Sequence, residues 1–165
     1  MRILVDADGT NRIKHVVDVA KQYGVPVTLF CDCSREMHSG YADVVYSDVR
    51  SEATDITLLN QCRKGDIVIT RDIGLAGIAL AKGARVLHDS GRLLDNRTID
   101  RDLAFRAMMQ RMRKNTKHYS QTRKVSFGME RGNCDFHGNL VMLIKRGVEK
   151  RQDSLPPQEK ERLTG

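Results

Sequence analysis

The sequence lacks the features that mark several large classes of protein. No apolar run approaches the roughly 20 residues that a membrane-spanning helix needs. Glycine-rich phosphate-binding patterns of the GxGxxG and Walker A types are absent, which argues against dinucleotide binding and P-loop chemistry. No basic segment with an apolar core precedes the first strand-like residues, so we expect no secretory signal and a cytoplasmic location.

Cysteine is scarce, and its spacing fits neither a zinc site nor a disulfide framework. The four cysteines are Cys31, Cys33, Cys62 and Cys134. Structural zinc sites usually combine two C-x(2-4)-C pairs, whereas Cys31 and Cys33 form a single C-x-C unit. Disulfides are rare in a reducing compartment. We therefore expect buried or incidental thiols, and no Ser-His-Asp or Cys-His arrangement is indicated.

What the sequence does contain fits one soluble domain. Its 165 residues, of which 40% are apolar and 30% charged, fall within the usual range of about 100 to 200 residues for a single domain. We expect that domain over residues 1–150 and a disordered, charged tail over 151–165.

A short apolar run near the start ends in two carboxylates. Ile3, Leu4 and Val5 predict a buried strand, and Asp6 and Asp8 follow where that strand should end. Ligands of open α/β sheets bind outside the carboxyl ends of the strands. The acid pair is therefore either a metal site or an Asp-x-Asp-Gly turn that needs no ligand.

Strand and helix patterns then alternate along the chain. The apolar patterns predict strands over 25–30, 42–46, 67–70 and 84–87, and helices over 13–23, 51–63 and 73–82. Thr54 and Thr98 are expected to cap helices. Helical connections of about ten residues or more imply parallel strand pairing, hence a three-layer α/β/α sandwich with a mainly parallel central sheet.

Parallel strands place their carboxyl ends on one edge, so acids from distant parts of the chain should meet there. Asp72 and Asp89 each follow a predicted strand, and Asp55 can join Asp6 and Asp8 from the start of its helix. Several carboxylates in one crevice repel one another unless a cation lies among them or one takes up a proton. Mg²⁺ or Mn²⁺, which prefer oxygen ligands, are the expected cofactors.

Three motifs together resemble a known family. They are Val5-Asp6-Ala7-Asp8, the segment 65–76 (GDIVITRDIGLA) and Lys82-Gly83-Ala84. Over about residues 1–112 the chain resembles the YaiI/YqxD family of uncharacterised bacterial proteins, which is grouped with PIN-like domains. PIN-like nucleases cleave RNA or DNA with a cluster of acidic residues and Mg²⁺ or Mn²⁺.

The resemblance implies which residues form the site. It gives Asp6, Asp55 and Asp72 as metal ligands with Asp89 as the candidate fourth acid, and Asp6, Asp8, Asp55 and Asp72 as the catalytic set. The domain over 1–150 would then be PIN-like.

This sequence departs from the family in one respect. Many members continue the opening motif with Ala-Cys-Pro, where this sequence has Gly-Thr-Asn at positions 9–11. Any role of that cysteine as a ligand or nucleophile is therefore not available here, whereas a purely carboxylate mechanism is unaffected.

Positive charge is concentrated in the last third of the chain. Residues 1–102 carry 14 Lys and Arg against 15 Asp and Glu (net −1), while residues 103–165 carry 14 against 6 (net +8). This density suits a polyanion, and a solvated helix face followed by a mobile basic loop over about 114–132 gives the same composition. A closing helix over about 136–148 is expected to pack on the domain or on a second copy of the chain.

The first functional hypothesis is a metal-dependent nuclease that acts on RNA or single-stranded nucleic acid, with RNA favoured over DNA. A metal-bound water would attack the phosphodiester. Thr70 and Arg71 would position or neutralise the phosphate, while Lys14, Arg113 and Lys114 would attract the nucleic-acid backbone. The alternatives are a non-catalytic nucleic-acid-binding module and a phosphoesterase that acts on a small substrate. A homodimer is the other partnership considered, and no membrane partner is expected.

Overall fold

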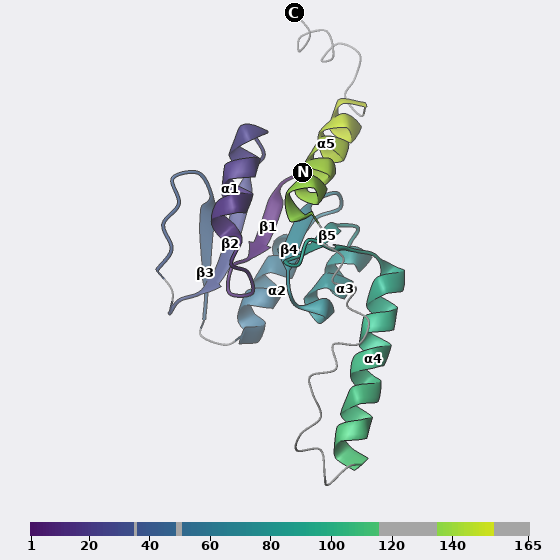
Figure 1. Ribbon diagram of the computed structural model, residues 1–165. Coiled ribbons are helices and arrows are strands. Elements are labelled where there is room, and N and C mark those ends of the chain that lie inside the picture. Colours follow the sequence, from purple (N-terminus) through teal and green to yellow (C-terminus); the bar gives the residue numbers. More distant parts are fainter. Residues whose placement is uncertain (35, 49–50, 116–134, 154–165) are drawn as a thin grey trace, which may run out of the picture.

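A computed structural model of the protein describes residues 1–34, 36–48, 51–115 and 135–153 (Figure 1). Within these residues the elements are β1 (Ile3–Asp6), α1 (Ile13–Gln22), β2 (Val27–Asp32), β3 (Asp43–Ser47), α2 (Ser51–Gln61), β4 (Ile67–Thr70), α3 (Ile73–Ala81), β5 (Arg85–His88), β6 (Leu93–Leu94), α4 (Asn96–Asn115) and α5 (Phe136–Asp153).

The strands form one sheet in the order β3-β2-β1-β4-β5-β6. All neighbouring pairs from β3 to β5 are parallel, and β6 alone runs antiparallel, against β5. The predicted mainly parallel sheet is therefore confirmed. The two-residue β6 was not predicted, because so short a segment carries no periodicity.

Helices cover both faces of the sheet. Alternate residues of a strand point to opposite faces, so Ile3 and Val5 pack with α1 and α5, whereas Leu4 packs with α2 and α3. Figure 1 shows α1 and α5 on one side of the strands and α2 and α3 on the other. The expected three-layer α/β/α sandwich is confirmed.

The two central strands form the most deeply buried part of the core. Every residue of β1 and β4 is buried, and Ile3, Val5, Ile67 and Ile69 are 0% exposed. Full burial of each such side chain contributes about 1.5–3 kcal/mol. The carboxyl ends of these strands are therefore held in fixed positions relative to each other, which matters for the polar residues that follow.

Neither Thr54 nor Thr98 is the residue that begins its helix. Helix α2 already begins at Ser51, so Thr54 lies inside it, where its hydroxyl hydrogen-bonds to the Ser47 hydroxyl. At the start of α4, Asp95 accepts a hydrogen bond from the Thr98 amide at 2.8 Å and Thr98 accepts one from the Asp95 amide at 2.9 Å. Asp95, rather than Thr98, is therefore the residue that begins this reciprocal cap.

Helix α5 closes the domain. It starts at Phe136 as expected and runs to Asp153, five residues beyond the expected end. Phe136, Leu140 and Ile144 lie in the core beside α1 and the sheet, so this helix packs on its own domain. Of the expected basic loop, residues 114 and 115 belong to α4, and the rest lies outside the described residues, as does the tail from 154 onward.

No helix in the described segments combines the length and apolarity that crossing a membrane requires.

Candidate functional site

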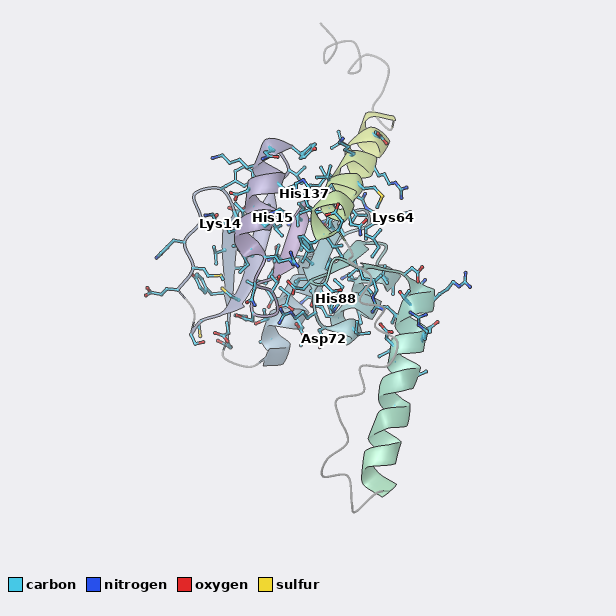
Figure 2. The ribbon with its side chains drawn as sticks, viewed as in Figure 1. Lys14, His15, Lys64, Asp72, His88 and His137 are labelled. Carbon is cyan, nitrogen blue, oxygen red and sulfur yellow. The ribbon has the colours of Figure 1, made fainter. Side chains whose placement is uncertain are left out.

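The candidate site lies where the direction of the chain across the sheet reverses. From β1 the chain continues to β2 and β3 on one side, and it later returns to place β4, β5 and β6 on the other side. Such a switch point leaves a crevice at the carboxyl ends of the two central strands. Lys64 and Asp72 mark the amino and carboxyl sides of β4 in Figure 2.

A pocket of about 350 Å³ opens at this position. It is lined by Asp6, Asp8, Gly9, Asp32, Thr54, Asp55, Arg71 and Asp72. The structure thus brings together all four acids of the predicted catalytic set. It adds a fifth, Asp32, which ends β2 and which the same strand-end reasoning could have identified.

Asp6 is the most buried acid of the pocket. Its side chain accepts hydrogen bonds from the Thr70 hydroxyl at 2.8 Å and from the Gly9 amide at 3.2 Å. Burial raises the pKa of Asp6 above its ordinary value of 3.8. These two hydrogen bonds oppose the shift, and the negative charges of Asp8 and Asp72 add to it. Among the described residues, the donors to the buried Asp6 carboxylate are therefore both electrically neutral groups.

The loop after β1 passes close to this carboxylate. A β-carbon at Gly9 would lie 2.4 Å from Asp6 Oδ2, which is closer than atoms can approach. Glycine is thus the residue that allows the backbone amide at position 9 to reach Asp6.

Thr70 links Asp6 to Asp72. Its hydroxyl donates to Asp6 and accepts a hydrogen bond from the Asp72 amide at 2.9 Å, and the residue is 0% exposed. Asp72 caps α3, because its Oδ1 accepts from the amides of Gly74 at 2.5 Å and Leu75 at 3.0 Å. Thr70 therefore orients the two acids, and its burial leaves it no access to a substrate phosphate.

Asp8 and Asp32 also line the pocket and are joined to each other. Asp8 is exposed, and its Oδ2 accepts a hydrogen bond from the Asp32 amide at 2.9 Å. Asp32 in turn accepts from the Ser34 amide at 2.9 Å. Asp8 thus both shapes the loop after β1 and presents a carboxylate at the pocket.

The donor atoms suit a hard divalent cation by type, although they are not gathered around one point. No group of three or more His, Cys, Asp or Glu side chains in the described part of the chain is placed to hold a metal ion. Mg²⁺, however, usually keeps several water ligands and binds through only one or two carboxylates. The wall of carboxylates fits that kind of hydrated ion.

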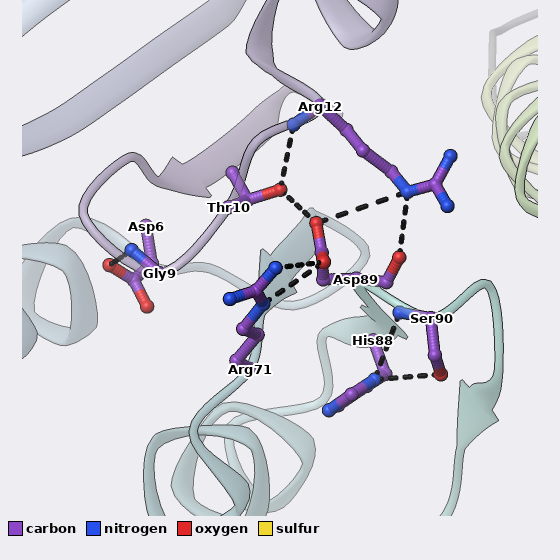
Figure 3. A network of polar contacts seen from close by, with 8 residues as sticks. All are labelled: Asp6, Gly9, Thr10, Arg12, Arg71, His88, Asp89 and Ser90. Carbon is purple, nitrogen blue, oxygen red and sulfur yellow. Dashed lines mark hydrogen bonds and ion pairs between the residues drawn. The ribbon is translucent and has the colours of Figure 1, made fainter.

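Asp89 occupies a different environment, shown in Figure 3. It is 8% exposed and does not line the pocket. Arg71 donates to its Oδ2 through Nε at 3.0 Å and Nη2 at 2.8 Å, and the Thr10 hydroxyl donates to its Oδ1. Burial alone would raise the pKa of Asp89, but these hydrogen bonds and the charges of Arg71 and Arg12 lower it below 3.8. The negative charge of Asp89 is therefore already stabilised by arginine and hydroxyl groups of the protein.

His88, the neighbour of Asp89, is held within the turn after β5. Its Nδ1 accepts a hydrogen bond from the Ser90 amide at 3.0 Å and lies 2.8 Å from the Ser90 hydroxyl. Burial, followed by the charge of Arg92, lowers its pKa below 6.5, and Asp89 only partly offsets the shift. His88 is thus a neutral, structural side chain at neutral pH.

The remaining predicted phosphate-binding residues are placed differently. Arg71 lines the pocket, as the sequence suggested. Lys14 is exposed on α1 and lines a separate pocket with Met37 and His38. Arg113 and Lys114 lie in the last turn of α4, and their side chains are outside the described structure.

Comparison with known proteins gives one consistent family. The family model described as "Uncharacterized BCR, YaiI/YqxD family" matches residues 4–146. A UPF0178 protein of Clostridium acetobutylicum is 40% identical over 114 residues, which cover 69% of this chain and 77% of that protein. A UPF0178 protein of Ruminiclostridium cellulolyticum is 36% identical over 153 residues, which cover 93% and 98%. One from Alkaliphilus oremlandii is 40% identical over 124 residues, which cover 75% and 80%. No solved structure matches the chain.

Proposed function

The chain belongs to the YaiI/YqxD family of uncharacterised bacterial proteins, and we propose that it is a divalent-metal-dependent nuclease that hydrolyses RNA or single-stranded nucleic acid. The observation that supports this proposal most is the pocket at the switch point of the sheet, whose walls carry five aspartates and one arginine. A crevice of carboxylates with a buried, uncompensated Asp6 favours occupation by a cation.

One or two of Asp6, Asp55 and Asp72, which come from β1, α2 and the N-cap of α3, would bind the ion directly, and water would link it to the others. Bound Mg²⁺ or Mn²⁺ would neutralise the phosphodiester and lower the pKa of a coordinated water. Without a cation, the negative pocket repels the phosphates of its own substrate, so we expect activity to require the metal.

The protein's own side chains would then act on the water and the phosphate. Asp8, exposed and held by the Asp32 amide, would accept the proton of the attacking water. Arg71, fixed by Asp89, would stabilise the charge that develops on the phosphate oxygens. Thr70 would hold Asp6 and Asp72 in fixed positions relative to each other.

The test is cleavage of labelled RNA and single-stranded DNA oligomers with Mn²⁺ or Mg²⁺. The double variant Asp6→Asn, Asp72→Asn should lose at least about 100-fold in rate, which is the scale of losing one electrostatic contact to a transition state. Asp43→Asn, an exposed aspartate at the opposite edge of the sheet, is the matched control and should cut like the parent. Intact oligomers after incubation with the parent protein, or equal cleavage by the double variant, would refute the proposal.

A second candidate is a nucleic-acid-binding module without turnover. It is favoured by one observation, namely that no three described acidic, histidine or cysteine side chains are already gathered for a metal. Such a module should keep its affinity for oligonucleotides after Asp6 and Asp72 are both neutralised and should cleave nothing with any divalent cation.

A further inference from the structure

We propose that Arg12 and Arg71, both held on Asp89, form a phosphate-binding subsite beside the acidic pocket. The ligand is a backbone phosphate of a single nucleic-acid strand, adjacent to the phosphate that enters the pocket. The inference rests on the proposed substrate class, but it concerns binding alone and is tested without turnover. Arg12 has no role in the sequence motifs and was not predicted from them.

Asp89 anchors both arginines from one buried position. Arg71 approaches its Oδ2 through Nε and Nη2. Arg12 donates through Nε to the backbone oxygen of Asp89 at 2.8 Å, and the same nitrogen lies 4.0 Å from Oδ1. The contacts join the loop before α1, the turn before α3 and the turn after β5. They therefore place two guanidinium groups around a single carboxylate.

The charges of this cluster do not cancel. Two arginines surround one aspartate, which leaves a net charge of +1, and their side chains are 45% (Arg12) and 51% (Arg71) exposed. Within the described structure, Arg71 Nη1 and both terminal nitrogens of Arg12 take part in no hydrogen bond. Figure 3 shows the terminal nitrogens of Arg12 directed away from Asp89. Unused guanidinium donors with surplus charge are what a phosphate oxygen binds best.

The two side chains are also fixed before any ligand arrives. Arg12 lies over the ring of Phe136, with its guanidinium carbon 4.7 Å from the ring centroid. Arginine carries about 2 kcal/mol of rotamer entropy, and most of this is already lost in the folded protein. Phosphate binding therefore costs less ordering than it would at a freely moving surface arginine.

The position of the cluster explains why it would help a nucleic-acid strand. Arg71 belongs to both the pocket wall and the Asp89 cluster, so the two sites are continuous. In Figure 3, Asp6 lies on one side of Arg71, while Asp89 and Arg12 lie on the other. A strand whose one phosphate faces the acids needs a positive neighbour for the next phosphate, and Arg12 is placed to supply it.

The test is fluorescence anisotropy of a labelled single-stranded oligonucleotide in EDTA, with Asp6→Asn, Asp72→Asn as the parent background. Arg12→Gln should weaken binding about 5- to 10-fold and reduce the slope of log K against log salt by about one, as expected for one lost phosphate contact. Arg63→Gln is the matched control, because Arg63 is an exposed arginine on the opposite edge of the sheet. It should change neither quantity.

Arg12→Lys provides a second, milder variant in case the glutamine disturbs folding. It keeps the charge but loses the planar fork, so the salt slope should stay like the parent and the affinity should fall only slightly. Equal affinity and slope for parent, Arg12→Gln and Arg12→Lys would overturn the inference, whether or not cleavage is observed. A cleavage assay that fails while Arg12→Gln still weakens binding would overturn only the nuclease proposal.

Discussion

Two buried aspartates at opposite edges of the sheet, Asp66 and Asp6, differ in the groups that surround them. At the amino edge, Asp66 is 4% exposed and accepts hydrogen bonds from the Arg2 amide at 3.1 Å, the Arg2 Nε at 3.4 Å and the Arg63 amide at 3.1 Å. At the carboxyl edge, Asp6 is 8% exposed, its described donors are the neutral Thr70 hydroxyl and Gly9 amide, and burial, followed by the charges of Asp8 and Asp72, raises its pKa.

This difference separates an acid whose donors include a cation from one whose described donors are all neutral. Arg85 adds a second cation near Asp66 and is itself held by the carbonyl oxygens of Leu143 at 2.6 Å and Gly65 at 2.9 Å. Asp66 therefore has both cationic and amide partners within the chain. At the carboxyl edge, none of the described donors to Asp6 is a cation, and the proposed metal would supply that charge.

Replacing Asp66 should have the largest effect on stability. Asp66→Ala leaves Arg2 Nε and two amides without their acceptor, and we expect it to lower the free energy of unfolding by about 3 kcal/mol. Asp6→Asn should change it by less than about 1 kcal/mol, since it removes an unfavourable charge together with two hydrogen bonds. Urea unfolding followed by circular dichroism measures both. A comparable loss of unfolding free energy in the two variants would contradict the difference inferred between Asp66 and Asp6.

Binding of the proposed metal ion should stabilise the protein by slightly less than Asp66→Ala destabilises it. With Mn²⁺ at 100 times its dissociation constant, the gain is about 2.7 kcal/mol, or roughly 5 to 11 °C in Tm. Asp6→Asn and Asp72→Asn should each abolish most of this shift, and Asp43→Asn should keep it. A thermal shift that survives the loss of Asp6 and Asp72 would place the ion elsewhere in the protein.

The pH dependence of stability should differ in sign between Asp6 and Asp89, and this is the smallest of the three effects. The pKa of Asp6 is raised in the folded state, so the folded protein binds more protons than the unfolded chain just above pH 3.8. Its contribution to stability therefore falls as pH rises through that window. The pKa of Asp89 is lowered, so its stabilising contribution is present above pH 3.8 and is lost as pH falls further.

The unfolding free energy of the parent minus that of each asparagine variant, measured from pH 3 to 7, isolates these two contributions. The difference for Asp6→Asn should decrease with rising pH, and the difference for Asp89→Asn should increase. Two curves with the same slope would contradict the opposite pKa shifts of Asp6 and Asp89.

Much of this arrangement was predictable from the order of residue types. Buried parallel strands read as continuous apolar runs, so Ile3–Val5 and Ile67–Thr70 identified the two central strands, and the acids after them could be assigned to one edge. The arrangement of side chains was not predictable in the same way. No local pattern indicates that Asp89 pairs with Arg71 and Arg12, because that contact depends on how three separate turns meet.

The parallel pairing of β1 with β4 has a consequence for the synthesis of the protein. Ile3 lies opposite Ile67, so during translation β1 has a partner only on its β2 side until more than 60 further residues have been made. At about 5–20 residues per second, that exposed strand edge persists for several seconds. Asp6 and Asp72 meet only when β4 takes its place, so the acidic pocket forms late, with the assembly of the sheet.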